Sequence, residues 1–322
     1  MTYEIKPWHP DRQVSKGAIA YHEAVVDAPY YTEILDELME AMDPKIKNDE
    51  IVVDFGAGTG VSALRLLKRV HKNFKLWIVD NSAAWLGNAH DIFKSDENVK
   101  CFLLNKTNDR YATLAETIGE EAADHVMCAN TVHLIPDIKE TFRGIYDSLK
   151  KKGTFTFQSG NIDNKNRKKG VLMVDDTIKK VREMALDIVR IDKRFKKYQE
   201  GLDKKIEMEN KQQKFVFPNP RPAETYLEAL KSAKFTFEIP KFKTFKVAYK
   251  DWMNFLRVKR LQAGILPEIG GKDPSPEEEE DRDKLIVMSA EKLFSDLAAN
   301  NPMADSTHYT IECAYFTAFK TS

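Results

Sequence analysis

Cysteine is scarce in this sequence of 322 residues, which contains only Cys101, Cys128 and Cys313. The three lie far apart, and no pair has the short spacing with which cysteines ligate a metal ion. Each lies in an apolar, strand-like run, where a buried thiol is the usual role of a single cysteine. The pattern therefore argues against a disulfide framework and a metal site, and it favours a reducing compartment.

Net charge is also missing, because 50 lysine and arginine residues balance 50 aspartate and glutamate residues. Proteins that bind nucleic acid usually carry a basic excess, so we expect no nucleic-acid partner. The chain has no apolar run of about 18 residues, and residues 1–8 form no apolar signal region. We therefore expect a cytoplasmic protein with no membrane partner.

What the sequence does contain is a glycine-rich segment at residues 51–60. It begins with an apolar, β-branched run that is typical of a buried parallel strand and ends in Asp54. Gly56, Gly58 and Gly60 alternate after it, and glycine allows both a sharp turn and the close approach of a ligand. Apolar residues then recur at helical spacing. The segment therefore predicts a strand, a ligand-binding loop and a helix in succession.

Two acidic residues indicate the kind of ligand. Asp54 lies two residues before Gly56, where a carboxylate would repel a pyrophosphate but suits a ligand that carries an ammonium group. A second predicted strand, residues 75–79, ends in Asp80, twenty residues after Gly60. A carboxylate at such a position accepts hydrogen bonds from a ribose diol. The G-x-G-x-G spacing also differs from the G-x-G-x-x-G of dinucleotide-binding enzymes, which disfavours a dehydrogenase.

Residues 54–60 and 79–80 resemble the first and second motifs of the class I S-adenosylmethionine-dependent methyltransferases. The resemblance implies an α/β fold, in which a Rossmann-like, seven-stranded methyltransferase sheet has helices on both faces. It also implies an enzyme whose cofactor is S-adenosyl-L-methionine and whose cofactor product is S-adenosyl-L-homocysteine. The cofactor-binding residues that it implies are Asp54, Gly56, Gly58, Gly60, Asp80, Asn81, Asn105, Asn130 and Thr131.

The third and fourth predicted strands are expected to end near the adenine and near the methyl group of the cofactor, respectively. After the third strand the family usually has an acid that holds the adenine amino group, and here Asn105, Asn108 and Asp109 compete for that role. The fourth strand runs into Asn130 and Thr131, which we expect to surround the transferred methyl group.

Two insertions of roughly sixty residues exceed the usual length of α/β connections. They leave the carboxyl ends of predicted parallel strands, where α/β sheets bind ligands, so we expect a mostly helical lid. Tyr21, His22, Tyr30 and Tyr31 are candidates to cover the cofactor from the N-terminal side. The expected parts are an N-terminal helical cover at 1–45, the S-adenosylmethionine-binding core at 46–160 and its continuation at 221–247, helical insertions at 161–220 and 248–306, and a final core strand at 307–322.

The first insertion has an apolar stripe at helical spacing over residues 174–206. A helix pair packed as a lid would bury this stripe, and so would a coil formed with a second copy of the chain. A homodimer therefore remains open. In the second insertion, Ser275 and Glu278 form a predicted capping box, so the acidic residues there indicate a helix start and not a metal site.

The sequence identifies a general base less clearly than it identifies the cofactor. Histidine titrates near neutral pH, which makes His133 and His308 candidates, and Tyr21 is a third. Each of these side chains is more often structural than catalytic when it is considered alone. We also expect an acceptor pocket that is partly aromatic, with walls from Trp252, Phe255, Tyr315 or Tyr249.

The expected function is methylation of a small-molecule acceptor at oxygen, nitrogen, carbon or sulfur, by direct in-line transfer under the lid. The chain lacks the Asn-Pro-Pro-Tyr tetrapeptide that is typical of base and glutamine-amide methylation. It also lacks a cysteine cluster of the arsenite type. Two alternatives stay open, a non-methylating enzyme of the same fold that uses S-adenosylmethionine and a non-catalytic dimeric scaffold.

Overall fold

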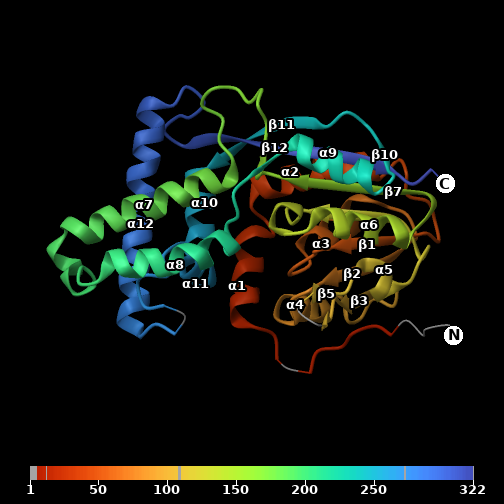
Figure 1. Ribbon diagram of the computed structural model, residues 1–322, viewed down its shortest axis with the longest axis horizontal. Coiled ribbons are helices and arrows are strands. Elements are labelled where there is room, and N and C mark those ends of the chain that lie inside the picture. The colour runs from red at the N-terminus through yellow and green to blue at the C-terminus, as the bar shows by residue number, and fades with distance from the viewer. Residues whose placement is uncertain (1–5, 12, 108–109, 272, 322) are drawn as a thin grey trace.

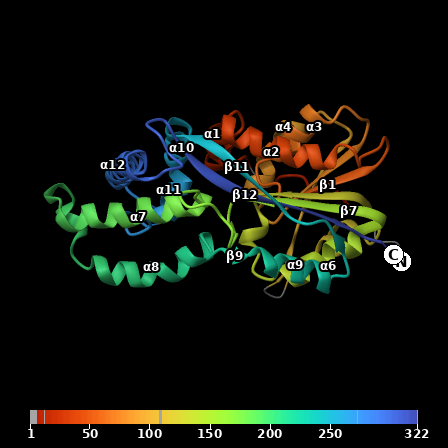
Figure 2. The ribbon, with the colours of Figure 1, turned by 90° about the horizontal axis from the view of Figure 1, so that it is seen from above.

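The computed structural model describes residues 6–11, 13–107, 110–271 and 273–321. A central sheet has helices on both faces, and a helical lobe built from α7, α8, α10, α11 and α12 extends from one end of it (Figures 1 and 2). No helix within these ranges is both long enough and apolar enough to span a membrane.

The main sheet of the described residues contains eight strands. They are β1 Ile51–Phe55, β2 Lys75–Asp80, β3 Val99–Leu103, β6 Ala123–Ala129, β7 Leu149–Ser159, β10 Thr236–Phe237, β11 Lys241–Ala248 and β12 His308–Phe319. Their order is β10-β12-β7-β6-β1-β2-β3, with β11 also paired to β12. Strands β1, β2, β3, β6 and β7 are parallel, and β12 runs antiparallel to β7. Two short pairs lie outside this sheet, β4 Lys106–Thr107 with β5 Arg110–Tyr111, and β8 Ile162–Asp163 with β9 Arg221–Pro222.

Strands β10 and β11 share one edge of the sheet. Thr236 pairs with Phe319 and Lys241 pairs with Tyr315, so the two strands follow one another along β12. Pro240 lies between them and has no N–H group to donate to the ladder. The predicted seven-stranded sheet is therefore confirmed, and the part of the core expected at 221–247 contributes its edge strand in two pieces, β10 and β11.

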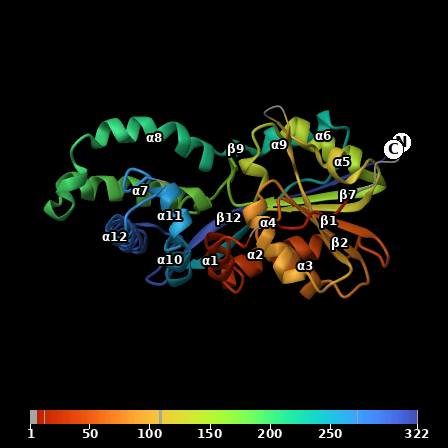
Figure 3. The same cartoon turned by 90° about the horizontal axis from the view of Figure 1, so that it is seen from below.

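Helices cover both faces of the sheet, as Figures 2 and 3 show. Side chains of α2, α3 and α4 pack in one hydrophobic core, and those of α5, α6 and α9 pack in a second core on the other face. The first core continues into the helical lobe, so the sheet and the lobe share buried side chains. The α-helices are α1 Lys16–Val25, α2 Pro29–Met42, α3 Val61–Arg69, α4 Ala83–Phe93, α5 Leu114–Ile118, α6 Ile138–Ser148, α7 Val174–Ile191, α8 Leu202–Val216, α9 Ala223–Ser232, α10 Tyr249–Leu256, α11 Lys259–Ile265 and α12 Pro276–Asn300.

The apolar stripe of the first insertion does not form one continuous helix. Helix α7 ends at Ile191, a 3₁₀ helix follows at Lys193–Tyr198, and Gly201 with a φ of 69° precedes α8. The buried side chains of α7 pack in the same core as those of α12, so this chain covers them itself. The homodimer stays a prediction. The capping box of Ser275 and Glu278 is present at the start of α12.

One prediction of local structure is wrong. Three lysines at residues 150–152 followed by Gly153 are typical of the last turn and the end of a helix, so the sequence predicts a helix end there. These residues lie instead in β7, which begins at Leu149. The backbone explains the difference, because Lys152 N–H donates to Lys320 O at 2.8 Å and Lys320 N–H donates to Gly153 O at 3.0 Å. Pairing with the end of the chain therefore extends the strand where local propensity favours a helix.

Candidate active site

The glycine loop crosses from the end of β1 to the start of α3. Gly56, Gly58 and Gly60 have φ angles of 70°, 56° and 87°, in the left-handed region that favours glycine. A Cβ on Gly56 would lie 2.4 Å from Thr131 Cγ2. Thr131 Oγ1 also donates a hydrogen bond to Gly56 O at 2.8 Å. The loop is therefore fixed directly against the segment that follows β6.

Asp80 at the end of β2 faces the same loop. One carboxylate oxygen accepts the Gly58 N–H at 2.8 Å, and the other accepts the Ser82 N–H at 2.8 Å. Burial raises the pKa of Asp80, and the N–H groups of Ser82, Gly58 and Asn81 oppose that shift. A carboxylate has about four acceptor positions, so these contacts leave capacity for a ribose diol. The side chain of Asn81 itself is exposed.

Asp54, in β1, is fully buried. Its Oδ2 accepts a hydrogen bond from Ser62 Oγ at 2.5 Å, and its Oδ1 has no partner among the described residues. Burial raises the pKa of Asp54 to about 7, against the lowering effect of the Ser62 hydrogen bond. A buried carboxylate oxygen without a donor is costly unless a ligand supplies one, and an ammonium group would do so.

The N-terminal helices lie directly on the loop. His22 Nδ1 lies 3.2 Å from Thr59 O and 3.3 Å from Thr59 Oγ1. Asn88 Nδ2 donates to the same Thr59 O at 3.1 Å. The rings of Tyr21 and Trp85 meet edge to face with centroids 4.6 Å apart. Helix α1 is therefore fastened to the loop and to α4 by polar and aromatic contacts.

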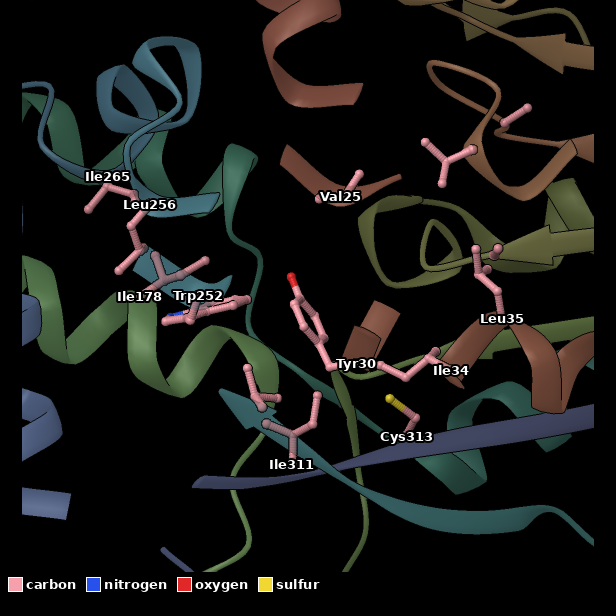
Figure 4. Close-up of a cluster of buried hydrophobic side chains, with 14 of the residues drawn as sticks. Val25, Tyr30, Ile34, Leu35, Ile178, Trp252, Leu256, Ile265, Ile311 and Cys313 are labelled. Carbon is pink, nitrogen blue, oxygen red and sulfur yellow. The ribbon is translucent and has the colours of Figure 1, made fainter. Parts of the chain in front are cut away.

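A small cavity of about 30 Å³ lies between the carboxyl ends of β6 and β7 and helices α1, α2, α7 and α10. Figure 4 shows Tyr30 standing between Trp252 and Ile34, with Cys313 of β12 beneath them. The cavity is mostly aromatic, and its lining residues are Tyr21, Tyr30, Tyr31, Ile34, Asn130, Gln158, Val174, Trp252, Phe255 and Cys313.

Of the three candidate bases, Tyr21 is the one that lines the cavity. His133 is buried outside the cavity lining, with Nδ1 2.9 Å from Ser159 Oγ and Nε2 3.3 Å from Asn161 Nδ2. Burial lowers the pKa of His133 to about 3, and the charge of Arg221 adds to the effect. His308 begins β12 and lies 2.7 Å through Nδ1 from Thr307 Oγ1, away from the cavity lining.

The remaining predicted residues fall in different places. Asn130, with a φ of 51°, follows β6 and lines the cavity next to Thr131. Asn105 is exposed after β3, and its carbonyl oxygen accepts the Ala112 N–H at 2.8 Å. Asn108 and Asp109, the other candidates for the adenine contact, lie outside the described residues.

Of the four aromatic residues predicted to line the acceptor pocket, two line the cavity and two do not. Trp252 and Phe255 line the cavity. Tyr315 lies behind it, where its hydroxyl donates to Ile34 O at 3.0 Å. Tyr249 stacks on Phe294 with centroids 4.4 Å apart and belongs to the lobe.

Three polar residues of the site had no role in the sequence predictions. Gln158 lines the cavity from β7, and its Oε1 has no hydrogen-bond partner among the described residues. Asn161 Nδ2 donates to Asp175 Oδ1 at 3.0 Å, and Asp175 N–H donates back to Asn161 Oδ1 at 2.8 Å. This pair ties the start of α7 to the segment after β7. No local sequence pattern marks these three residues, because their roles depend on which groups they meet in the folded chain.

The carboxylates of the site do not assemble a metal centre. Across the described ranges, no three histidine, cysteine, aspartate or glutamate side chains are placed to hold a metal ion together.

Comparison with known proteins identifies the class of this domain. Residues 52–153 match the family described as a methyltransferase domain. The carboxy-S-adenosyl-L-methionine synthase of Nautilia profundicola is 27% identical over 149 residues, which are 46% of this chain and 59% of that protein. The chain therefore spans less than two thirds of that curated relative.

Solved structures share the fold at low sequence identity. The YcgJ protein of Bacillus subtilis has a TM-score of 0.50 at 14% identity, over 90% of this chain and 99% of its own. Phosphoethanolamine N-methyltransferase 2 of Haemonchus contortus, in complex with S-adenosyl-L-methionine, has a TM-score of 0.53 at 16% identity. That alignment covers 95% of this chain and 57% of the other.

Residues 52–153 therefore match a methyltransferase domain, and the shared fold agrees with the resemblance to the class I S-adenosylmethionine-dependent methyltransferases noted in the sequence. The matched residues run from β1 through the glycine loop and β6 into β7. S-adenosylmethionine is the cofactor of this class. The residues present suit it, because Asp54 Oδ1 has no donor among the described residues and Asp80 has acceptor capacity to spare.

Proposed function

We propose that this chain transfers the methyl group of S-adenosylmethionine to a small-molecule acceptor whose reacting atom enters the aromatic cavity, which at about 30 Å³ holds only a small part of such a molecule. The observation that carries the proposal is the position of residues 130–131. Thr131 bonds to the glycine loop at Gly56, and its neighbour Asn130 lines the cavity. Two consecutive residues therefore contact the loop assigned to the cofactor and the cavity.

The bound cofactor supplies a methyl group on a positively charged sulfur, which is already a good leaving group. The chain then has to bind the two reactants, orient them toward each other and exclude water. Asp54 and Asp80 offer carboxylates to an ammonium group and a ribose. Tyr30, Trp252 and Phe255 surround the cavity with apolar surface, which keeps water away from the reacting atoms.

The helical cover also accounts for acceptor choice in this proposal. Three helical segments supply part of the cavity wall, with Tyr21 and Tyr30 from the N-terminal helices, Val174 from α7, and Trp252 from α10. Changes in these helices would alter the size of the cavity without altering the glycine loop. We therefore assign acceptor specificity to the cover and the lobe, and cofactor binding to the sheet.

The test of the proposed function is transfer of a labelled methyl group from S-adenosylmethionine to small molecules. We expect a labelled small molecule and one equivalent of S-adenosylhomocysteine for each turnover. A protein that binds S-adenosylmethionine but labels no acceptor in a broad small-molecule extract would contradict the proposal.

A second candidate is an enzyme that modifies S-adenosylmethionine without transferring its methyl group. The similarity over 149 residues to a protein named carboxy-S-adenosyl-L-methionine synthase favours this candidate. Mass spectrometry of the cofactor after turnover separates the two. S-adenosylhomocysteine indicates methyl transfer, a heavier S-adenosylmethionine indicates modification, and methylthioadenosine indicates cleavage of another bond.

A further inference from the structure

Gln158 is a buried polar residue of the cavity, and one atom of its side-chain amide is left unpaired within the described ranges. The residue is 1% exposed, and it lies near the carboxyl end of β7 among aromatic side chains. The side chain contacts Cys313, and its Oε1 has no hydrogen-bond partner among the described residues. Leaving such an acceptor unpaired costs about 1–3 kcal/mol, so a ligand that donates a hydrogen bond is favoured at this position.

The rest of the cavity lining carries no formal charge. Its described residues include no aspartate, glutamate, lysine, arginine or histidine. Burial raises the pKa of Tyr21 to about 12 and the pKa of Cys313 to about 12, so both keep their protons near neutral pH. The lining therefore offers no group that readily removes a proton, and it would leave a charged acceptor unpaired.

These properties select among nucleophiles. An amine nitrogen carries a lone pair and attacks before it loses a proton, whereas a hydroxyl group needs a base during the attack. A cationic acceptor is disfavoured, because it would be repelled by the positive sulfur of the donor at short range. An uncharged N–H compound meets both conditions, and its hydrogen matches the free acceptor on Gln158.

We propose that the acceptor presents an uncharged amine nitrogen to the cavity, and that Gln158 Oε1 orients this nitrogen by accepting a hydrogen bond from its N–H. This inference rests on the proposed function. The nitrogen lone pair forms the bond to the methyl carbon, the carbon–sulfur bond breaks with its electron pair left on sulfur, and the methylated nitrogen then loses its proton to solvent.

The first test identifies the methylated atom. The protein is incubated with S-adenosylmethionine labelled with carbon-13 in the methyl group and with a small-molecule cell extract. The carbon-13 chemical shift of each product separates N-methyl from O-methyl, S-methyl and C-methyl groups. We expect N-methyl products. Labelled products of the other kinds alone would overturn this inference and leave the proposed function standing, whereas no labelled small molecule at all would contradict both.

The second test addresses Gln158 with a matched control. Gln158→Met keeps the length of the side chain and removes the carbonyl oxygen. Thr156→Val is the control, because Thr156 lies two residues earlier in β7 with a buried, unpartnered hydroxyl and is not part of the cavity lining. We expect Gln158→Met to lower kcat/KM for the labelled acceptor about tenfold, the loss of roughly one hydrogen bond.

Affinity for S-adenosylhomocysteine, measured by calorimetry, is the readout that does not depend on turnover. We expect Gln158→Met and Thr156→Val to bind it as the unchanged protein does, which also shows that both variants fold. Equal kcat/KM in Gln158→Met and Thr156→Val would overturn the role of Gln158. A loss of S-adenosylhomocysteine binding confined to Gln158→Met would overturn it as well, because the residue would then act on the cofactor side.

Discussion

Asp54 makes the stability of this protein depend on pH in a direction opposite to that of most carboxylates. The side chain is fully buried with one oxygen unpaired, and burial raises its pKa to about 7 from the ordinary value of 3.8. The unfolded chain therefore releases this proton near pH 4, and the folded chain holds it until about pH 7. The contribution of Asp54 to stability is full below pH 4 and is lost as the pH rises through 7.

The size of this effect follows from the difference in pKa. A difference of about 3 corresponds to roughly 4 kcal/mol, a large part of the stability of an ordinary domain. Asp54→Asn has nearly the same shape and cannot ionise, so it removes this dependence. We expect the free energy of unfolding of the Asp54→Asn variant, relative to the unchanged protein, to rise by a few kcal/mol between pH 4 and pH 8.

Urea unfolding of both proteins at a series of pH values measures the difference, and titration of other groups cancels in the comparison. Parallel stability profiles for the two proteins would refute the reasoning. The same carboxylate gives a second readout, because an ammonium group beside it favours ionisation. Binding of S-adenosylmethionine near pH 6 should then release a proton from the unchanged protein and not from the Asp54→Asn variant, as calorimetry in buffers of different ionisation enthalpy would show.

Further substitutions test other parts of the structure. Gly56→Ala places a Cβ 2.4 Å from Thr131 at a φ of 70°, and thermal unfolding should show a loss of about 1–3 kcal/mol; an unchanged midpoint would contradict the described loop. Ser275→Ala removes the cap of α12 and should cost about 1 kcal/mol in urea unfolding, whereas no loss would mean that Glu278 alone caps the helix. Arg221→Met removes a guanidinium that donates to the carbonyls of residues 132, 133 and 135; we expect a loss of roughly 2 kcal/mol, and a neutral result would show that water replaces it.

The sequence predicts the cofactor loop well because that part of the site is local. Asp54, the three alternating glycines and Asp80 belong to consecutive strand ends, and parallel strands bring such ends to one edge of a sheet. Spacing along the chain therefore translates directly into proximity. The start of α2 at Pro29 also follows from a local preference, because proline favours the first position of a helix.

The cavity could not be predicted in the same way, because its walls come from distant segments. Tyr21, Gln158, Trp252 and Cys313 are separated by dozens of residues, and no periodicity relates them. Trp252 was expected in the acceptor pocket for its aromatic ring alone. Gln158 gave no local signal of its role, since its significance depends on lacking a partner in the folded chain.

The central claim is that the glycine loop and Asp80 bind S-adenosylmethionine beside the aromatic cavity. Thermal unfolding with excess S-adenosylmethionine, S-adenosylhomocysteine or NADH tests it most directly. At about 100 times its dissociation constant a ligand adds roughly 2.7 kcal/mol to stability. We expect this gain with both sulfur compounds, none with NADH, and a loss of the gain in Asp80→Ala. No gain with either sulfur compound, or an equal gain with NADH, would contradict the account.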